Sequence, residues 1–279
     1  MANKRRIIGW EAMVISTITV ASFVVQHLIG DVPVALFSFP LNILTLALWL
    51  VALVWLYRSR HSSKVAQSLL SMRATTLSLL LMVALGITFG VQRQALTTSW
   101  AASAAILFIL SHLALITLRG WRDGNNKPRI RFILNHLGLI LALGAGFWGA
   151  PDREELRVIV ERDTPTNIAY TKDGSRSVLD YDMTMTNFAI EFFDTGVPSS
   201  FEAKVRIDKE DVTLRVNHPY NRTFSETIYL ISYDGEQPTD ARYCILEVVR
   251  EPWRWVTVAG IVMLIAGAIL MFIQGKNRG

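Results

Sequence analysis

Long apolar runs occupy both ends of the chain, and a region of alternating apolar and polar residues separates the last two runs. A hydrocarbon core about 30 Å thick requires about 20 largely apolar helical residues. The sequence contains six segments that reach or approach this length, namely 7–28, 34–57, 75–91, 100–118, 132–149 and 255–273. This pattern predicts about six transmembrane helices, of which 75–91 is the shortest.

Residues 150–254 follow a different period. Three short segments (156–161, 201–207 and 212–216) alternate apolar and polar residues, and 227–233 and 243–249 are rich in β-branched and aromatic residues. Short alternating segments separated by turn residues are typical of antiparallel strands. We therefore predict an all-β domain, an antiparallel sandwich or a partly open barrel, between the last two helices.

The predicted organisation has three parts. Residues 1–149 form a transmembrane region with five helices, residues 150–254 form the β-rich domain, and residues 255–279 form a last transmembrane helix and a tail. The first segment follows Lys4, Arg5 and Arg6 as a signal peptide would, but no clear cleavage site follows it. We therefore expect it to remain as a membrane span.

Lys and Arg in the short connections predict the orientation, because cytoplasmic loops carry an excess of both. Fourteen of these residues fall on one side of the predicted membrane, and the opposite short loops carry only Arg93. The fourteen are Lys4, Arg5, Arg6, Arg58, Arg60, Lys64, Arg73, Arg119, Arg122, Lys127, Arg129, Arg131, Lys276 and Arg278. Both termini are therefore expected in the cytoplasm and the β-rich domain on the opposite side of the membrane.

The net charge of +5 is not spread evenly along the chain. Residues 150–254 hold 20 acidic and 13 basic residues, so the positive charge belongs to the cytoplasmic loops. Those loops suit orientation and contact with anionic membrane lipid, and no nucleic-acid partner is expected. The single cysteine, Cys244, excludes an intramolecular disulfide and a cysteine zinc cluster. No GxSxG, HExxH or P-loop motif occurs, so we expect no catalytic centre in this chain alone.

Two histidines fall inside predicted spans, where ionisable groups are costly and are functional candidates. His112 lies six residues before the end of its span, and His136 lies four residues after the start of the next span. At 1.5 Å per residue both are within about 10 Å of the cytoplasmic side. This depth suits haem, whose iron takes axial histidine and whose propionates would meet the basic loops.

Each of these features also has a purely structural interpretation. A buried membrane histidine often hydrogen-bonds a neighbouring helix. The small-residue stripe Gly138, Ala142 and Gly146 provides either close helix packing or room for a porphyrin edge. His27, at the outer end of the first span, has no assigned role.

The segment FILNHLGLILALGAG (132–146) carries His136 in a distinctive setting. Six further segments are distinctive in the same way: LITLR (115–119), WGAPDR (148–153), LRV (156–158), VNHP (216–219), IYLISYD (228–234) and ILEVVREP (245–252). Taken together and in this order, they resemble the ResB/CcsB proteins of cytochrome c biogenesis (system II), in their short ResB-like form. The segment 132–146 is similar to the histidine-bearing helix of that family.

The resemblance implies a haem-handling membrane subunit. Such proteins work with a CcsA/ResC-type partner, moving haem b across the membrane and presenting it to the CxxCH thiols of apocytochrome c. By this resemblance His136 is an axial ligand of the haem iron, the second ligand comes from the partner, and the β-rich domain lies in the periplasm of a bacterial inner membrane. From their own positions in the spans, His112 and Gly138 are further candidates for contact with haem. The chain lacks the partner's tryptophan-rich loop, so it is not expected to attach haem alone.

Two other functions stay open at this point. His112 and His136, at similar depth, would suit both axial ligands of a self-contained b-type electron carrier. A membrane-anchored assembly factor without a cofactor is the other alternative.

Overall fold

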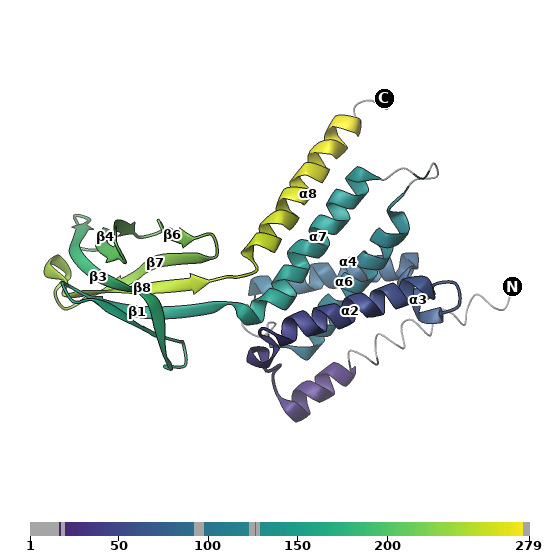
Figure 1. The fold of residues 1–279 in the computed structure, drawn as a ribbon, viewed down its shortest axis with the longest axis horizontal. Coiled ribbons are helices and arrows are strands. Elements are labelled where there is room, and N and C mark those ends of the chain that lie inside the picture. The colour runs from purple at the N-terminus through teal and green to yellow at the C-terminus, as the bar shows by residue number, and fades with distance from the viewer. Residues whose placement is uncertain (1–16, 18–19, 92–97, 123–125, 127–128, 276–279) are drawn as a thin grey trace. The chain divides into compact units, whose positions relative to one another are not determined.

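The structure is a computed structural model that describes the chain except for residues 1–16, 18–19, 92–97, 123–125, 127–128 and 276–279. The chain divides into a helical unit, Met1–Pro151 with Val256–Gly279, and a β unit, Asp152–Trp255 (Figure 1). The following charged residues used above for the orientation lie outside the described residues: Lys4, Arg5, Arg6, Arg93, Lys127, Lys276 and Arg278.

Five helices in the described residues are long and apolar enough to cross a membrane. They are α2 (Leu41–Arg58), α4 (Met72–Val91), α6 (Trp100–Gly120), α7 (Ile130–Gly149) and α8 (Arg254–Gly275). A short helix, α3 (Lys64–Leu69), joins α2 to α4. The chain is therefore a multi-helix membrane protein. Most of the first predicted span lies outside the described residues, and its described end is the short apolar helix Val20–Ile29, so the count of six is not established.

The predicted start of the second span at residue 34 is wrong. Val34–Phe37 forms a separate turn of 3-10 helix, and α2 begins only at Leu41, directly after Pro40. Proline keeps the residue before it out of the α region, which separates the two segments. The opposite error occurs at the third span, where α4 begins at Met72, three residues earlier than predicted, and so has full membrane length.

Helix α6 is the most buried of these helices, and it contacts α2, α3, α4 and α7. Trp49 of α2 donates a hydrogen bond from Nε1 to Ser111 Oγ of α6 at 2.9 Å. The Tyr57 hydroxyl donates to the Leu118 carbonyl at 3.2 Å. Such polar contacts between helices supplement van der Waals packing where neighbouring lipid is as apolar as the side chains.

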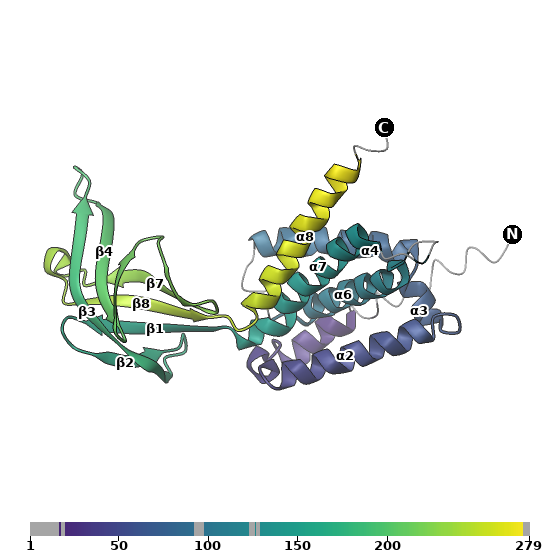
Figure 2. The same cartoon turned by 45° about the horizontal axis from the view of Figure 1, so that its top comes forward.

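The β unit consists of one eight-stranded antiparallel sheet with the order β5-β4-β3-β2-β1-β8-β7-β6 (Figure 2). The strands are β1 (Glu154–Glu161), β2 (Thr166–Tyr170), β3 (Arg176–Phe192), β4 (Pro198–Ile207), β5 (Glu210–Arg215), β6 (Tyr220–Thr223), β7 (Glu226–Tyr233) and β8 (Tyr243–Arg250). Alternate residues point into one core, as in β1, where Leu156, Val158 and Val160 are buried. The prediction of an antiparallel all-β domain is confirmed, and the described strands form one sheet, not the two separate sheets of a sandwich.

Candidate functional site

His136 lies in the second turn of α7, and its ring is half-buried. It stacks on the ring of Phe132, with centroids 3.9 Å apart and planes 27° apart. Nδ1 lies 2.9 Å from the Phe132 carbonyl oxygen. A carbonyl only accepts hydrogen bonds, so Nδ1 must carry the hydrogen in this contact. The Nε2 lone pair then remains for another partner, and a metal-ligating histidine is usually held in this way.

The side chains near His136 on the helix surface form what we call the His136 stripe: Phe132, His136, Leu139, Leu143 and Phe147. At 3.6 residues per turn these five positions fall within about 80° of the helix circumference. All five are half-buried in the described structure. The stripe is thus an apolar, aromatic surface around a single imidazole.

Arg129 continues this surface at the start of α7. Its guanidinium carbon lies 4.9 Å from the centroid of the Phe132 ring. Arg129 precedes His136 by seven residues, or about 10 Å along a helix. A cation, an aromatic ring and an imidazole therefore follow one another along one side of α7. This order would suit a ligand with an anionic edge and an apolar body that carries a metal.

Gly138 lies on the other side of α7, about 200° around the helix from His136. A Cβ at Gly138 would meet the Gly260 carbonyl oxygen of α8 at 2.8 Å and Leu264 N at 3.0 Å. A Cβ at Gly260 would in turn meet Ala142 N at 2.7 Å. Gly138 therefore lets two helix backbones pack closely, and this packing leaves it no open side for a ligand. At Gly146, by contrast, a Cβ would meet nothing within 4 Å.

His112 is held differently from His136. Its residue is 4% exposed, and Nδ1 lies 2.6 Å from the Leu69 carbonyl oxygen at the end of α3. Arg119 donates from Nη1 to the next carbonyl, Leu70 O, at 3.2 Å. These two side chains of α6 thus hold the C-terminal end of α3, which agrees with the structural interpretation of a buried membrane histidine. No hydrogen bond or ring contact joins His112 to His136 in the part of the chain that the structure describes.

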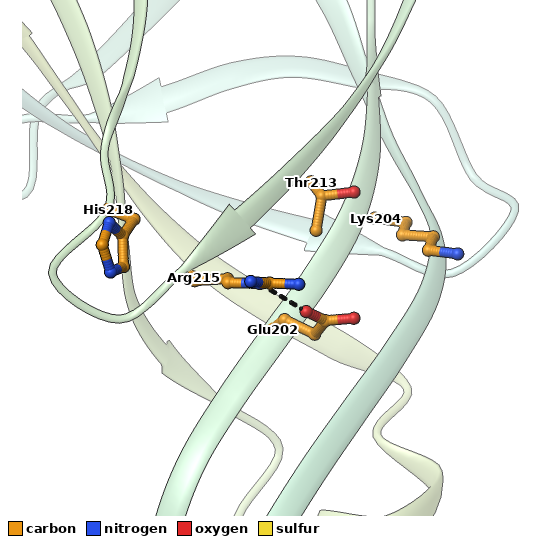
Figure 3. A pocket seen from close by; sticks show the side chains of 5 residues that line it. All are labelled: Glu202, Lys204, Thr213, Arg215 and His218. Atoms are coloured by element: carbon orange, nitrogen blue, oxygen red, sulfur yellow. Dashed lines mark hydrogen bonds and ion pairs between the residues drawn. The ribbon is translucent and has the colours of Figure 1, made fainter.

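The remaining histidines do not gather a ligand set. His27 and His61 are exposed on the helical unit, and His218 is exposed in the turn after β5. His218 borders an open hollow with Glu202, Lys204, Thr213 and Arg215 (Figure 3). Glu202 already pairs with Arg215 there, at 2.7 Å. Among the described residues no group of three His, Cys, Asp or Glu side chains is placed to hold a metal ion.

The structure also contains a buried ionic cluster in the β unit that sequence reasoning missed. Glu226 is 5% exposed and accepts hydrogen bonds from the Tyr181 hydroxyl at 3.0 Å, Arg222 Nη1 at 3.1 Å and Arg250 Nε at 2.6 Å. Burial, together with the nearby Glu226 charge, raises the pKa of Tyr181. These residues lie on four strands, β3, β6, β7 and β8, which meet only when the sheet forms. Their positions along the sequence therefore do not indicate that they are in contact.

Comparison with known proteins gives one family. Residues 128–243 match the model of the ResB-like family, so the match begins just before α7 and ends at the start of β8. No curated protein matches the chain. Among solved structures, "Cytochrome c Heme Lyase CcmF" is similar with a TM-score of 0.37 and 17% identity, over 71% of this chain and 34% of that chain. This chain thus spans about a third of that protein's length.

Proposed function

We propose that this chain, a ResB-like protein, is a membrane subunit of a cytochrome c biogenesis system that binds haem b at His136. The family match supports a role in cytochrome c biogenesis, and the five apolar helices support a place in the membrane. With a CcsA/ResC-type partner, the subunit would help haem to cross the membrane and reach apocytochrome c. The β unit would then lie on the periplasmic side and both termini in the cytoplasm, as the loop charges predict.

The observation that carries this proposal is the geometry of His136. Its Nδ1–H bond to the Phe132 carbonyl leaves Nε2 as the ligating atom, on a half-buried apolar stripe. Bound haem would supply an iron centre that takes axial histidine. Arg129, about 10 Å away along the helix, would pair with a propionate, because guanidinium and carboxylate form strong charge-assisted hydrogen bonds.

The second axial ligand is proposed to come from the partner subunit. His112 is a poor candidate, since its ring is almost fully buried and Nδ1 is engaged with Leu69. A macrocycle would reach it only if α3 moved away from α6. This burial disfavours the self-contained carrier in which His112 and His136 ligate one haem.

The test is an absorption spectrum of the full chain, purified with and without the partner subunit. We expect His136→Ala to remove most of the haem and added imidazole to restore part of it, because imidazole replaces a lost ligand but not a lost packing contact. His61→Ala, at an exposed loop histidine, is the matched control.

The other outcomes separate the alternatives. Full haem retention in His136→Ala would reject the ligand assignment. Equal loss of haem in His112→Ala and His136→Ala, in the chain alone, would favour the self-contained carrier. A colourless complex that still supports cytochrome maturation would favour an assembly factor without a cofactor.

A further inference from the structure

The hairpin formed by β3 and β4 extends beyond the rest of the sheet (Figure 2). Strand β2 pairs with β3 only as far as Met183, and β5 pairs with β4 only from Glu202 onward. Beyond Met183 in β3 and before Glu202 in β4, the two strands still pair with each other, for example at Ile190 with Phe201 and at Phe192 with Pro198. We call residues 187–201 the overhang.

The core-facing side of β3 continues into the overhang and becomes exposed there. Phe188 is 6% exposed and belongs to the core, Ile190 is partly buried against it, and Phe192 is 42% exposed. At the tip, Phe193 and Val197 are 59% and 57% exposed. The overhang therefore presents an apolar surface that no described residue of the β unit covers, and such surfaces often mark interaction sites.

The charge of the overhang has one sign. Residues 187–201 contain Glu191 and Asp194 but no Lys or Arg. Both carboxylates are exposed, and in the described part of the chain neither forms a salt bridge. Anionic lipid would be repelled by this surface. A partner with basic and apolar side chains would be complementary to it.

The backbone of the overhang suggests the form of that partner. The Phe201 carbonyl accepts a hydrogen bond from Val216 N at 3.4 Å. Elsewhere in the overhang each strand pairs only with the other among the described residues, so its second edge has backbone groups that can pair with an added strand. An extended peptide commonly binds such an edge by main-chain hydrogen bonds, while alternate side chains contact the surface beside it.

We propose that the overhang is a docking edge for an extended, unfolded polypeptide segment with alternating apolar and basic side chains. The segment adds as a strand beside β3 or β4 and covers Phe192, Phe193 and Val197. This inference rests on the proposed function only for the identity of that polypeptide, an apocytochrome c before haem attachment.

The experiment uses the full chain in lipid nanodiscs and a fluorescein-labelled peptide of Val-Lys-Val-Ser repeats, with binding followed by fluorescence anisotropy. We expect the double variant F192S/F193S to weaken binding about tenfold or more, which corresponds to a loss of about 1.4 kcal/mol. E191K/D194K should weaken binding of this peptide and strengthen binding of a Val-Glu-Val-Ser counterpart. The control V178S changes a residue of β3 that is 63% exposed but lies outside the overhang, and it should bind as the unmodified chain does.

Three results would overturn the proposal. The first is unchanged affinity in F192S/F193S while Cys244 stays protected from thiol reagents, which shows that the β unit is folded. The second is equal binding of the same peptide N-methylated at alternate residues, which cannot form the strand hydrogen bonds. The third is a spin label at V197C that reports collisions with oxygen typical of lipid, since the overhang would then enter the bilayer. The haem spectrum of F192S/F193S should be unaltered, so a failure here is distinct from a failure at His136.

Discussion

Replacing Glu226 by Gln would remove one negative charge from the centre of the ionic cluster in the β unit. The Glu226 side chain is 6% exposed, and those of its partners Arg222 and Arg250 are 27% and 29% exposed. Glutamine keeps the size of the side chain and one acceptor oxygen. Its NH₂ group would replace a carboxylate oxygen that now accepts a hydrogen bond from an arginine. Two hydrogen-bond donors would then face each other at that position.

The expected loss of stability follows from this geometry. Removing one member of a buried ion pair costs about 3–5 kcal/mol, because the partner charge is left uncompensated. Arg250 would retain contacts to Asp180 at 3.4 Å and Glu154 at 3.6 Å, and both arginines reach solvent. We therefore expect a value at the lower end, about 3 kcal/mol.

Cys244 provides the assay in the full chain. It is the only cysteine, it lies in β8 at 0% exposure, and its labelling by a maleimide therefore reports opening of the β unit alone. Detergent-solubilised protein would be pulse-labelled across a urea series. With a urea dependence of about 2 kcal/mol per molar, the Glu226→Gln midpoint should fall by about 1.5 M.

The control is Glu236→Gln, which changes an 89% exposed side chain whose nearest ion-pair contact is 3.9 Å from Arg242. Exposed pairs contribute at most about 1 kcal/mol, so its midpoint should move little. Equal midpoints for the two variants would refute the reasoning that the buried Glu226 carboxylate stabilises the β unit.

Other predictions follow from single sites. Gly260→Ala should lower the melting temperature of the solubilised chain, because the added Cβ would lie 2.7 Å from backbone atoms of α7. Gly146→Ala is the control and should leave the melting temperature unchanged, because its Cβ would meet nothing within 4 Å. Equal melting temperatures for the two variants would contradict the close packing of α7 and α8. The raised pKa of Tyr181 means that the folded state holds this proton more tightly than the unfolded state. The resulting stability is complete below about pH 10 and is lost as pH rises above that value. Urea midpoints at pH 9 and pH 11 should therefore differ more in the unmodified chain than in Tyr181→Phe. Cys244 should react with a maleimide at pH 8 only after unfolding, and rapid labelling of the native chain would show that β8 is not buried as described.

The local features of the chain were predictable, and the long-range ones were not. Alternation predicted parts of three strands, and β-branched and aromatic content predicted parts of two more. Strand β3 also alternates, with Leu179, Tyr181 and Met183 all buried. That signal was missed because the intervening Asp180 and Asp182 have low strand propensity. A single sheet brings distant strands together, so the Glu226 cluster has no counterpart in sequence spacing.

The same contrast applies to the two membrane histidines. The bond from His136 to the Phe132 carbonyl joins residues four apart, a spacing that any helix provides. The partner of His112 is Leu69, 43 residues away, and the partner of Gly138 is Gly260 on α8. The similar depths predicted for the two histidines therefore did not indicate that His112 is the more buried, because its burial depends on how α3 packs against α6.

The burial of Cys244 has a consequence for work with thiol-bearing clients. Burial raises the pKa of its thiol to about 12, so at neutral pH the side chain supplies almost no thiolate, the form that attacks disulfides. If an apocytochrome binds the β unit as proposed, a CxxCH pair that had oxidised to a disulfide would meet no thiolate from this chain. Cys244, buried in β8, would then form no mixed disulfide with the bound polypeptide.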